Sequence, residues 1–435
     1  MAVFDTGPID NRGAPRTTQL TIRLFNTGRL PAVAAIEAYQ INPAGAGFTS
    51  ETVYVVNLVT LNPFGTPDSG FTLDNVFADL DVFGVRVLTS GLGANDIAVT
   101  IFEKGPIGQI FAEHVLEGEL THIQELLFAY VTSRQDIVTV INTGTNTIVA
   151  TIALPDGSDP FGVAVTPDGS RAYVTNRGND TVTVISTATN TILTTISLPP
   201  GATPIGIAVT PDGSRAYVAN LGNDTVTVIS TATNTILTTI IFPNGSSPRA
   251  IAITPDGSRA YVTNEGNDTV TVIDTATNTI LTTIVFPADS IPFDVAITPD
   301  GSRAYVTTFF TPLASVTVID TATNTILTTI NLPTDEEAAS EIAITPDGSR
   351  AYVVRGQGNV ITVINTIRNS ILTTITLPLF TGTEDVAITP DDSRVYTANN
   401  RGSVTVIDTT SNEIIGNLPA GGGATAIAIT PILLF

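Results

Sequence analysis

The stretch Pro167–Asn176 (PDGSRAYVTN), followed by Asp180–Ile185 (DTVTVI) and Thr191–Ile196 (TILTTI), decides the fold because it recurs almost unchanged to the end of the chain. Aligned on its tyrosine, the unit occurs at Tyr130, Tyr173, Tyr217, Tyr261, Tyr305, Tyr352 and Tyr396, with 43 to 47 residues between successive copies. A period of about 40 to 50 residues with four strand-like runs per copy is typical of a β-propeller with one blade per repeat. The sequence therefore predicts an all-β propeller with seven blades.

Within one repeat, apolar residues alternate with Thr and Ser at a period of two, as half-buried strands require. The four expected strands of one blade are Gly206–Val209, Arg215–Ala219, Thr225–Ile229 and Thr235–Ile240. Between the first two, Pro211-Asp212-Gly213 combines the fixed φ of proline with a glycine that can adopt positive φ, which favours a tight hairpin.

The chain resembles the YVTN family of β-propeller repeats, whose four letters are found at Tyr173–Asn176 and again at Tyr261–Asn264. The resemblance covers roughly residues 125–435 and implies the propeller fold. Because the family occurs in surface-layer, secreted and envelope proteins, the resemblance also implies a cell-surface context, without naming a ligand or a reaction.

The two ends of the repeat region predict how the ring closes. Residues Phe128–Ser133, Asp136–Ile141 and Thr147–Ile152 match the last three strands of a blade that has no innermost strand before them. The C-terminal run Ala424–Pro431 matches the innermost strand. We expect it to pair with the strand that carries Tyr130, so that no propeller edge stays open.

Composition narrows the classes of function. The 435 residues contain 40 Asp and Glu against 18 Lys and Arg, a net charge of −22, so nucleic acid is not an expected partner. Cysteine is absent, which excludes a cysteine nucleophile and Cys-ligated metal sites.

The first residues do not have the form of a secretory signal, and no run is long enough to span a membrane. We expect an extracellular or cell- or spore-surface location, with the cytoplasm as the alternative.

Residues 1–124 precede the repeats. Residues 1–16 are rich in Gly, Pro, Asp and Asn and are expected to form a flexible arm. Residues 17–124 are expected to form a small antiparallel β-sandwich that anchors or assembles the protein, and the propeller is expected to occupy 125–435. The strand-like runs of the sandwich are Gln19–Asn26, Val33–Ile41, Thr52–Leu61, Val82–Leu88, Ile97–Phe102 and Ile110–Val115.

One set of propeller loops varies between repeats, whereas the other set hardly changes. Variable loops on a constant scaffold are common binding sites, and neutral drift of surface loops is the alternative. A surface glycan or a protein would be a suitable ligand for this face. The candidate residues on the variable face are Phe309, Phe310, Asp335, Glu336, Glu337, Arg249 and Glu384.

Carboxylates gather at one position of the repeat, near the start of the innermost strand. This position holds Gly162, Gly206, Ala250, Asp294, Glu341, Asp385 and Ala426. Three successive blades therefore place Asp294, Glu341 and Asp385 at one level of the channel mouth, where they could bind Ca²⁺ or raise one another's pKa. Solvated acids at the channel mouth are the alternative.

Only two histidines are present, His114 and His122, both before the repeats and not at HExxH spacing, so Ser-His-Asp catalysis in the propeller is excluded.

Three classes of function follow. The leading hypothesis is a non-enzymatic surface protein that polymerises through its N-terminal arm and displays the propeller for adhesion or protection. The alternative is a metal-dependent, lactonase-like hydrolase that uses Asp294, Glu341 and Asp385. A cytoplasmic scaffold or a propeller that binds a small ligand is the third.

Overall fold

The computed structural model describes residues 127–309, 314–333, 338–356, 359–378 and 381–431, together with the backbone of the strands between Ala2 and Leu116. The chain forms two compact units, one made mainly of Met1–Glu125 and the other of Leu126–Leu433. All regular elements in the described residues are strands.

The strands of the N-terminal unit form two antiparallel sheets. Their orders are β1-β7-β4-β5, with β2 also on β7, and β6-β3-β8-β9. The strands are β1 (Ala2–Asp5), β2 (Ile9–Asp10), β3 (Gln19–Asn26), β4 (Ala32–Pro43), β5 (Thr49–Leu61), β6 (Gly70–Phe77), β7 (Val82–Ser90), β8 (Ile97–Lys104) and β9 (Ile110–Leu116).

All six strand-like runs predicted from the sequence of this unit coincide with strands, and β1, β2 and β6 are additional ones. The flexible arm expected over residues 1–16 differs from the structure, because Ala2–Asp5 and Ile9–Asp10 pair with β7. The short alternating run at Ala2–Asp5 supplies the main-chain donors and acceptors that an edge of β7 needs. The sandwich packing of the two sheets and assembly through the arm stay predictions.

The second unit is a seven-bladed propeller, and each blade is a four-stranded antiparallel sheet. Blade I contains β37 (Ala424–Ile429), β10 (Phe128–Ser133), β11 (Ile137–Asn142) and β12 (Thr147–Ala153). Blades II and III contain β13 (Pro160–Val165), β14 (Arg171–Asn176), β15 (Thr181–Ser186), β16 (Thr191–Ser197), β17 (Pro204–Val209), β18 (Arg215–Asn220), β19 (Thr225–Ser230) and β20 (Thr235–Ile241).

The remaining four blades repeat this order from the innermost to the outermost strand. Blades IV and V contain β21 (Pro248–Ile253), β22 (Arg259–Asn264), β23 (Thr269–Asp274), β24 (Thr279–Val285), β25 (Pro292–Ile297), β26 (Arg303–Thr308), β27 (Ser315–Asp320) and β28 (Thr325–Asn331). Blades VI and VII contain β29 (Ala339–Ile344), β30 (Arg350–Arg355), β31 (Val360–Asn365), β32 (Ser370–Thr376), β33 (Thr383–Ile388), β34 (Arg394–Asn399), β35 (Ser403–Asp408) and β36 (Ile414–Pro419).

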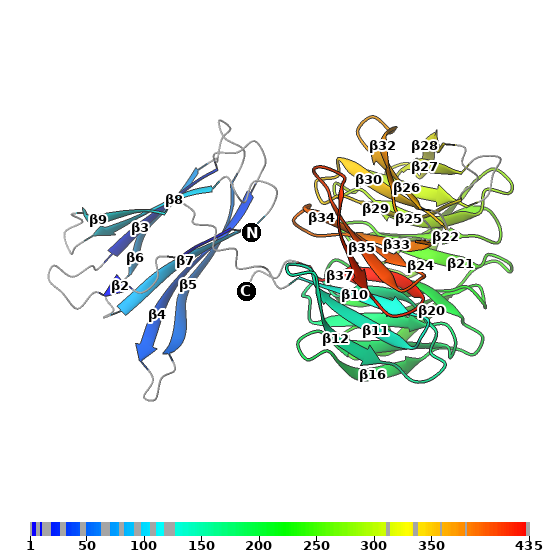
Figure 1. Ribbon diagram of the computed structural model, residues 1–435, viewed down its shortest axis with the longest axis horizontal. Coiled ribbons are helices and arrows are strands. Elements are labelled where there is room, and N and C mark those ends of the chain that lie inside the picture. Colours follow the sequence, from blue (N-terminus) through cyan, green and yellow to red (C-terminus); the bar gives the residue numbers. More distant parts are fainter. Residues whose placement is uncertain are drawn as a thin grey trace. The chain divides into compact units, whose positions relative to one another are not determined.

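The predicted ring closure is confirmed. The C-terminal strand β37 pairs antiparallel with β10, and Ala428 lies opposite Tyr130 (Figure 1). Blade I is thus built from the two ends of the repeat region, and its side chains pack against blade VII in one apolar cluster that includes Val131, Ile427 and Val406. Because both ends contribute to one sheet, neither can separate without breaking that blade.

The tyrosine of each repeat joins blades that are neighbours in the ring. The hydroxyl of Tyr173 donates to Oδ1 of Asn234 at 2.7 Å, in a turn of the next blade, and Arg171 donates to the carbonyl of Thr231 in the same turn. Asn234 has a positive φ of 54°, a conformation that asparagine adopts more readily than most residues. The corresponding tyrosines are all completely buried, namely Tyr130, Tyr173, Tyr217, Tyr261, Tyr305, Tyr352 and Tyr396.

The threonine and asparagine of the motif have separate roles. Thr175 accepts the N–H of Gly162 at 2.7 Å and donates to the carbonyl of Ile205 in the next blade at 2.8 Å, so one hydroxyl links two innermost strands. Asn176 donates to Thr183 at 2.8 Å within its own blade. Each such buried bond contributes on the order of 1 kcal/mol, and near-identical repeats multiply the contribution around the ring.

Candidate functional site

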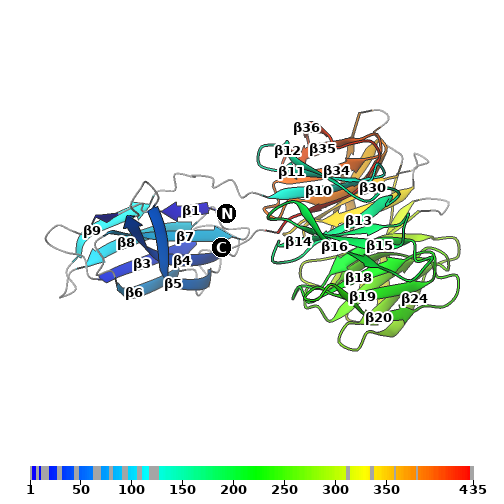
Figure 2. The same cartoon turned by 90° about the horizontal axis from the view of Figure 1, so that it is seen from below.

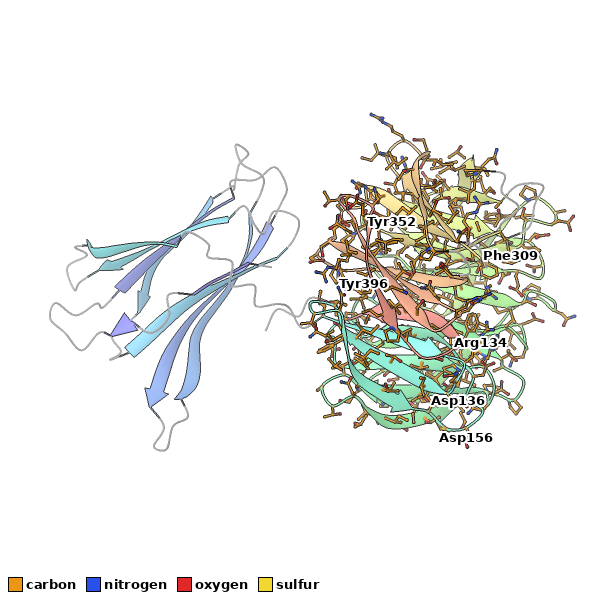
Figure 3. The ribbon with its side chains drawn as sticks, in the orientation of Figure 1. Arg134, Asp136, Asp156, Phe309, Tyr352 and Tyr396 are labelled. Atoms are coloured by element: carbon orange, nitrogen blue, oxygen red, sulfur yellow. The ribbon has the colours of Figure 1, made fainter. Side chains whose placement is uncertain are left out.

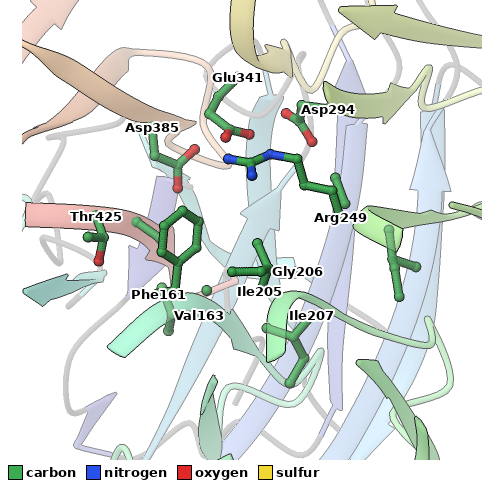
Figure 4. A pocket seen from close by; sticks show the side chains of 14 residues that line it. Phe161, Val163, Ile205, Gly206, Ile207, Arg249, Asp294, Glu341, Asp385 and Thr425 are labelled. Carbon is green, nitrogen blue, oxygen red and sulfur yellow. The ribbon is translucent and has the colours of Figure 1, made fainter. Parts of the chain in front are cut away.

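A cavity of about 140 Å³ lies in the channel, at the end where the innermost strands begin (Figure 4). The structure places all seven residues of the predicted position around it. They are Gly162, Gly206, Ala250, Asp294, Glu341, Asp385 and Ala426. The repeat alignment therefore predicted correctly which side chains converge, because equal positions in equal blades lie at equal heights along the channel.

The two halves of the cavity wall differ in chemistry. At Gly162 and Gly206, an added Cβ would lie 2.3 Å from a carbonyl oxygen of the next innermost strand, so main chain forms the wall there. On the other half, Asp294, Glu341 and Asp385 supply carboxyl groups that are partly buried. A ligand in the cavity would meet backbone and apolar groups on one side and acids on the other.

Two of these carboxyl groups also hold neighbouring blades together. Oδ2 of Asp294 accepts the N–H of Ile342 in blade VI at 2.8 Å. Oδ2 of Asp385 accepts the N–H of Ile427 in the closing strand β37, also at 2.8 Å, and its Oδ1 accepts the N–H of Val386 at 2.7 Å. The acids are therefore oriented by main-chain donors, which fixes their positions in the cavity.

Burial and mutual repulsion shift the pKa values of the three acids upward. Burial raises the pKa of Glu341 well above its usual value, and the charges of Asp294 and Asp385 raise it further, while Arg249 opposes this. Burial likewise raises the pKa of Asp294, although a hydrogen bond with Glu341 lowers it. The pKa of Asp385 is raised to about 8, mainly by burial. Burial therefore favours the protonated forms of all three acids, and a side-chain hydrogen bond joins Glu341 to Asp294.

Arg249 is the basic group of the cavity. Figure 4 shows its guanidinium end directed toward Glu341 and Asp294. Its guanidinium carbon lies 3.5 Å from the ring centre of Phe293 and 5.7 Å from that of Phe161, and Nη1 donates to Glu265 at 3.3 Å. Only 14% of its side chain is exposed. The two rings and one carboxylate thus hold the cation in place beside the acids.

The calcium site predicted at Asp294, Glu341 and Asp385 is not supported by this geometry. Among the described residues, no group of three or more His, Asp or Glu side chains is arranged to hold a metal ion. Several of the carboxyl oxygens already have partners: Oδ2 of Asp294 and both oxygens of Asp385 accept main-chain N–H groups, and Glu341 is hydrogen-bonded to Asp294.

The other predicted site residues fall into three groups. Phe309 stacks on Phe293, with ring centres 4.8 Å apart, and so lies beside Arg249. Glu384 does not line the cavity; it accepts a hydrogen bond from Asn400 at 3.0 Å and lies 3.9 Å from Arg134. Outside the described residues are Phe310, Asp335, Glu336 and Glu337.

The sequence reasoning missed the aromatic residues of the site. Phe161 lines the cavity, and Phe293 holds Arg249 from β25. Both immediately precede the position that was compared between repeats, and so does Arg249. Comparing this preceding position around the ring would have revealed two phenylalanines and an arginine.

Comparisons with known proteins agree on the fold. The family described as "Lactonase, 7-bladed beta-propeller" matches residues 201–414. A putative 6-phosphogluconolactonase from Bacteroides fragilis is similar in structure, with a TM-score of 0.59 and 15% identity over 71% of this chain and 99% of that one. Hydrazine synthase from Kuenenia stuttgartiensis has a TM-score of 0.58 and 23% identity over 62% of this chain and 89% of that one.

A functionally unknown protein from Desulfotomaculum acetoxidans also has a TM-score of 0.58, with 21% identity over 70% of this chain and 99% of that one. No curated protein matches the sequence. At these identities the structures are evidence for the fold alone, and the family model matches just under half of the chain. The described part of the chain also contains no helix that is long and apolar enough to cross a membrane.

Proposed function

We propose that the propeller is a lactonase-type hydrolase that opens a small cyclic ester in the channel-mouth cavity. The observation that carries the proposal is the group formed by Asp294, Glu341, Asp385 and Arg249, in which burial raises the pKa of the acids toward the range useful for proton transfer at neutral pH. The match to a lactonase family over residues 201–414 supports the same reaction class. This proposal replaces the leading hypothesis of a non-enzymatic surface protein.

The groups suggest a division of roles. Asp385, with a pKa of about 8, accepts the proton of the attacking water as that water adds to the ester carbonyl. Arg249 stabilises the negative charge that develops on the carbonyl oxygen. Glu341, whose pKa is raised by burial, gives its proton to the ring oxygen as the carbon–oxygen bond breaks, and the product is a hydroxy acid. Proton transfer within the acid group then returns Asp385 and Glu341 to their starting states.

The size of the cavity limits the substrate. Its volume of about 140 Å³ lies below the roughly 300 Å³ at which pockets for drug-sized ligands begin. The proposal therefore concerns lactones of one small ring, with any further substituent extending out of the channel. At Gly162 and Gly206 the wall of the cavity is main chain, since an added Cβ would collide with a carbonyl oxygen of the next strand.

The experiment is a pH-stat assay with γ- and δ-lactones, including sugar lactones with and without a phosphate group. We expect hydrolysis by the wild type and a loss of at least about 100-fold in kcat for Glu341→Gln and Asp385→Asn, because each removes a proton-transfer group. Asp156→Asn is the matched control, since it removes a carboxylate that lies exposed at the periphery of the propeller (Figure 3). No hydrolysis of any lactone, or equal rates in all variants, would contradict the proposal.

The cluster also suggests binding without turnover as a second candidate. Asp294 and Asp385 already link blades through the N–H groups of Ile342 and Ile427, so the acids have a structural role besides any catalytic one. If the protein binds a lactone or sugar in the cavity without hydrolysing it, the ligand should raise the melting temperature of the protein, and no acid should be released. Surface display through the N-terminal unit stays a separate prediction, compatible with either candidate.

A further inference from the structure

The outermost strands of the propeller carry no charged residue, although the protein as a whole has a net charge of −22. Their sequences are TIVATIA, TILTTIS, TILTTII, TILTTIV, TILTTIN, SILTTIT and IIGNLP, in the order of blades I to VII. A rim without charge on a strongly acidic protein is the surface where a second acidic molecule meets the least repulsion.

Blades III and IV differ from the others at the last residue of this strand. Ile241 is 76% exposed and Val285 is 71% exposed. The equivalent residues of the flanking blades II and V, in the same strand register, are Ser197 and Asn331. Two neighbouring blades thus end in large exposed apolar side chains, whereas the blades beside them end in polar ones.

The same strands are sheet edges. In the described residues, β20 pairs only with β19 and β24 only with β23, so one side of each strand has no strand partner. Figure 2 shows β18, β19 and β20 following one another toward the rim. Proteins commonly protect such edges with Lys, Pro or inward-pointing charges, and neither TILTTII nor TILTTIV contains any of these.

The exposed side chains provide enough area for a contact. Leu237 and Leu281 are 52% and 51% exposed, in addition to Ile241 and Val285. Half-exposed to mostly exposed side chains of this size each offer on the order of 100 Å², so these four supply about half of the roughly 800 Å² per partner of a standard interface. Ile236 and Ile280, which are 37% and 39% exposed, and the exposed threonines of the same strands add to this area. Threonine and β-branched residues also favour strand pairing.

We propose that the outer edges of blades III and IV, formed by β20 and β24, are a self-association surface whose occupant is a second copy of this chain. A two-fold axis tangential to the rim sets β20 of one copy antiparallel to β20 of the other, so an identical edge is self-complementary. The absence of charge favours another copy over a charged partner. This surface is separate from the channel mouth, so the inference does not depend on the proposed activity.

The test is sedimentation velocity of the full chain at increasing concentration, with and without residues 1–16. We expect a concentration-dependent dimer that persists without those residues. Ile241→Lys combined with Val285→Lys is expected to weaken dimerisation by more than about tenfold, because four like charges would face one another in the contact. The matched control, Ser197→Lys combined with Asn331→Lys, adds the same charge in the flanking blades and is expected to dimerise as the wild type does.

Two results would overturn the inference. A wild-type chain that stays monomeric at about 100 μM, in the range where even weak standard interfaces form, shows that the rim is no interface. Equal effects of the two double variants show that added positive charge, and not the position on blades III and IV, governs association. Circular dichroism of both variants establishes that each is folded, which keeps the comparison meaningful.

Discussion

The acids at the channel mouth should make the protein less stable as the pH rises through the neutral range. Asp385 has its pKa raised from 3.8 to about 8 in the folded protein. Between pH 3.8 and about 8, the carboxyl group of Asp385 has lost its proton in the unfolded chain and still holds it in the folded protein. The contribution of Asp385 to the free energy of unfolding is therefore fully present below about pH 4, and it is lost progressively as the pH rises to about 8.

The size of the effect follows from the pKa difference. At about 1.4 kcal/mol per pKa unit, the rise at Asp385 corresponds to at most about 5 kcal/mol between pH 4 and 9. Asp294 and Glu341 are raised too and act in the same direction. The aspartates of the turns between the innermost and the second strand of each blade, such as Asp168, have lowered pKa values and lose their contribution only below the usual aspartate range, outside this window.

The assay is urea unfolding at pH 5, 7 and 9 for the wild type, Asp385→Asn and Asp156→Asn. The free energy of unfolding should fall with pH in the wild type and in Asp156→Asn. In Asp385→Asn the fall between pH 5 and 9 should be smaller by about 2 to 4 kcal/mol, since asparagine still accepts one N–H but does not titrate. A decrease of the same size in all three proteins would refute the account of the cluster.

Three further predictions concern the ring and its cation. Tyr396→Phe should destabilise the protein by about 1 to 3 kcal/mol in urea unfolding, because it leaves Asn146 on the opposite side of the ring seam without its buried donor; an unchanged midpoint would contradict this. Deleting residues 424–435 removes β37 and should abolish cooperative melting or cause aggregation through β10, so unchanged melting and solubility would argue against ring closure. Arg249→Met should move the loss of stability toward higher pH, because the positive charge lowers the pKa of Glu341, whereas Arg177→Met, used as the control, should not.

The repeats made most of the propeller predictable. Seven copies of one sequence unit fix the blade number, the strand order and the height of each residue along the channel, and the unmatched ends fix the closure. The fold of the N-terminal unit is harder to predict because its sequence contains no repeats against which a local pattern can be checked. The sequence predicts a flexible arm over residues 1–16, since nothing in the four-residue run Ala2–Asp5 indicates that an edge of β7 is available to it.

The site was predictable in position and not in bonding. Aligning the repeats brought Asp294, Glu341 and Asp385 together correctly, yet it could not show that two of them accept N–H groups from the following blade. These hydrogen bonds depend on the side-chain torsion angles at the interface between two blades, and the repeat pattern of a sequence does not predict such angles. The same limit applies to Arg249, whose direction is set by its stacking on Phe293.

The pH dependence of kcat/KM for lactone hydrolysis tests the central claim most directly. The account predicts that activity rises as Asp385 loses its proton near pH 8, and that this rise is absent in Asp385→Asn, while Asp156→Asn keeps the wild-type profile. A wild-type profile that is flat between pH 6 and 9, or one that Asp385→Asn reproduces, would contradict the assignment of the channel-mouth acids as the reaction centre.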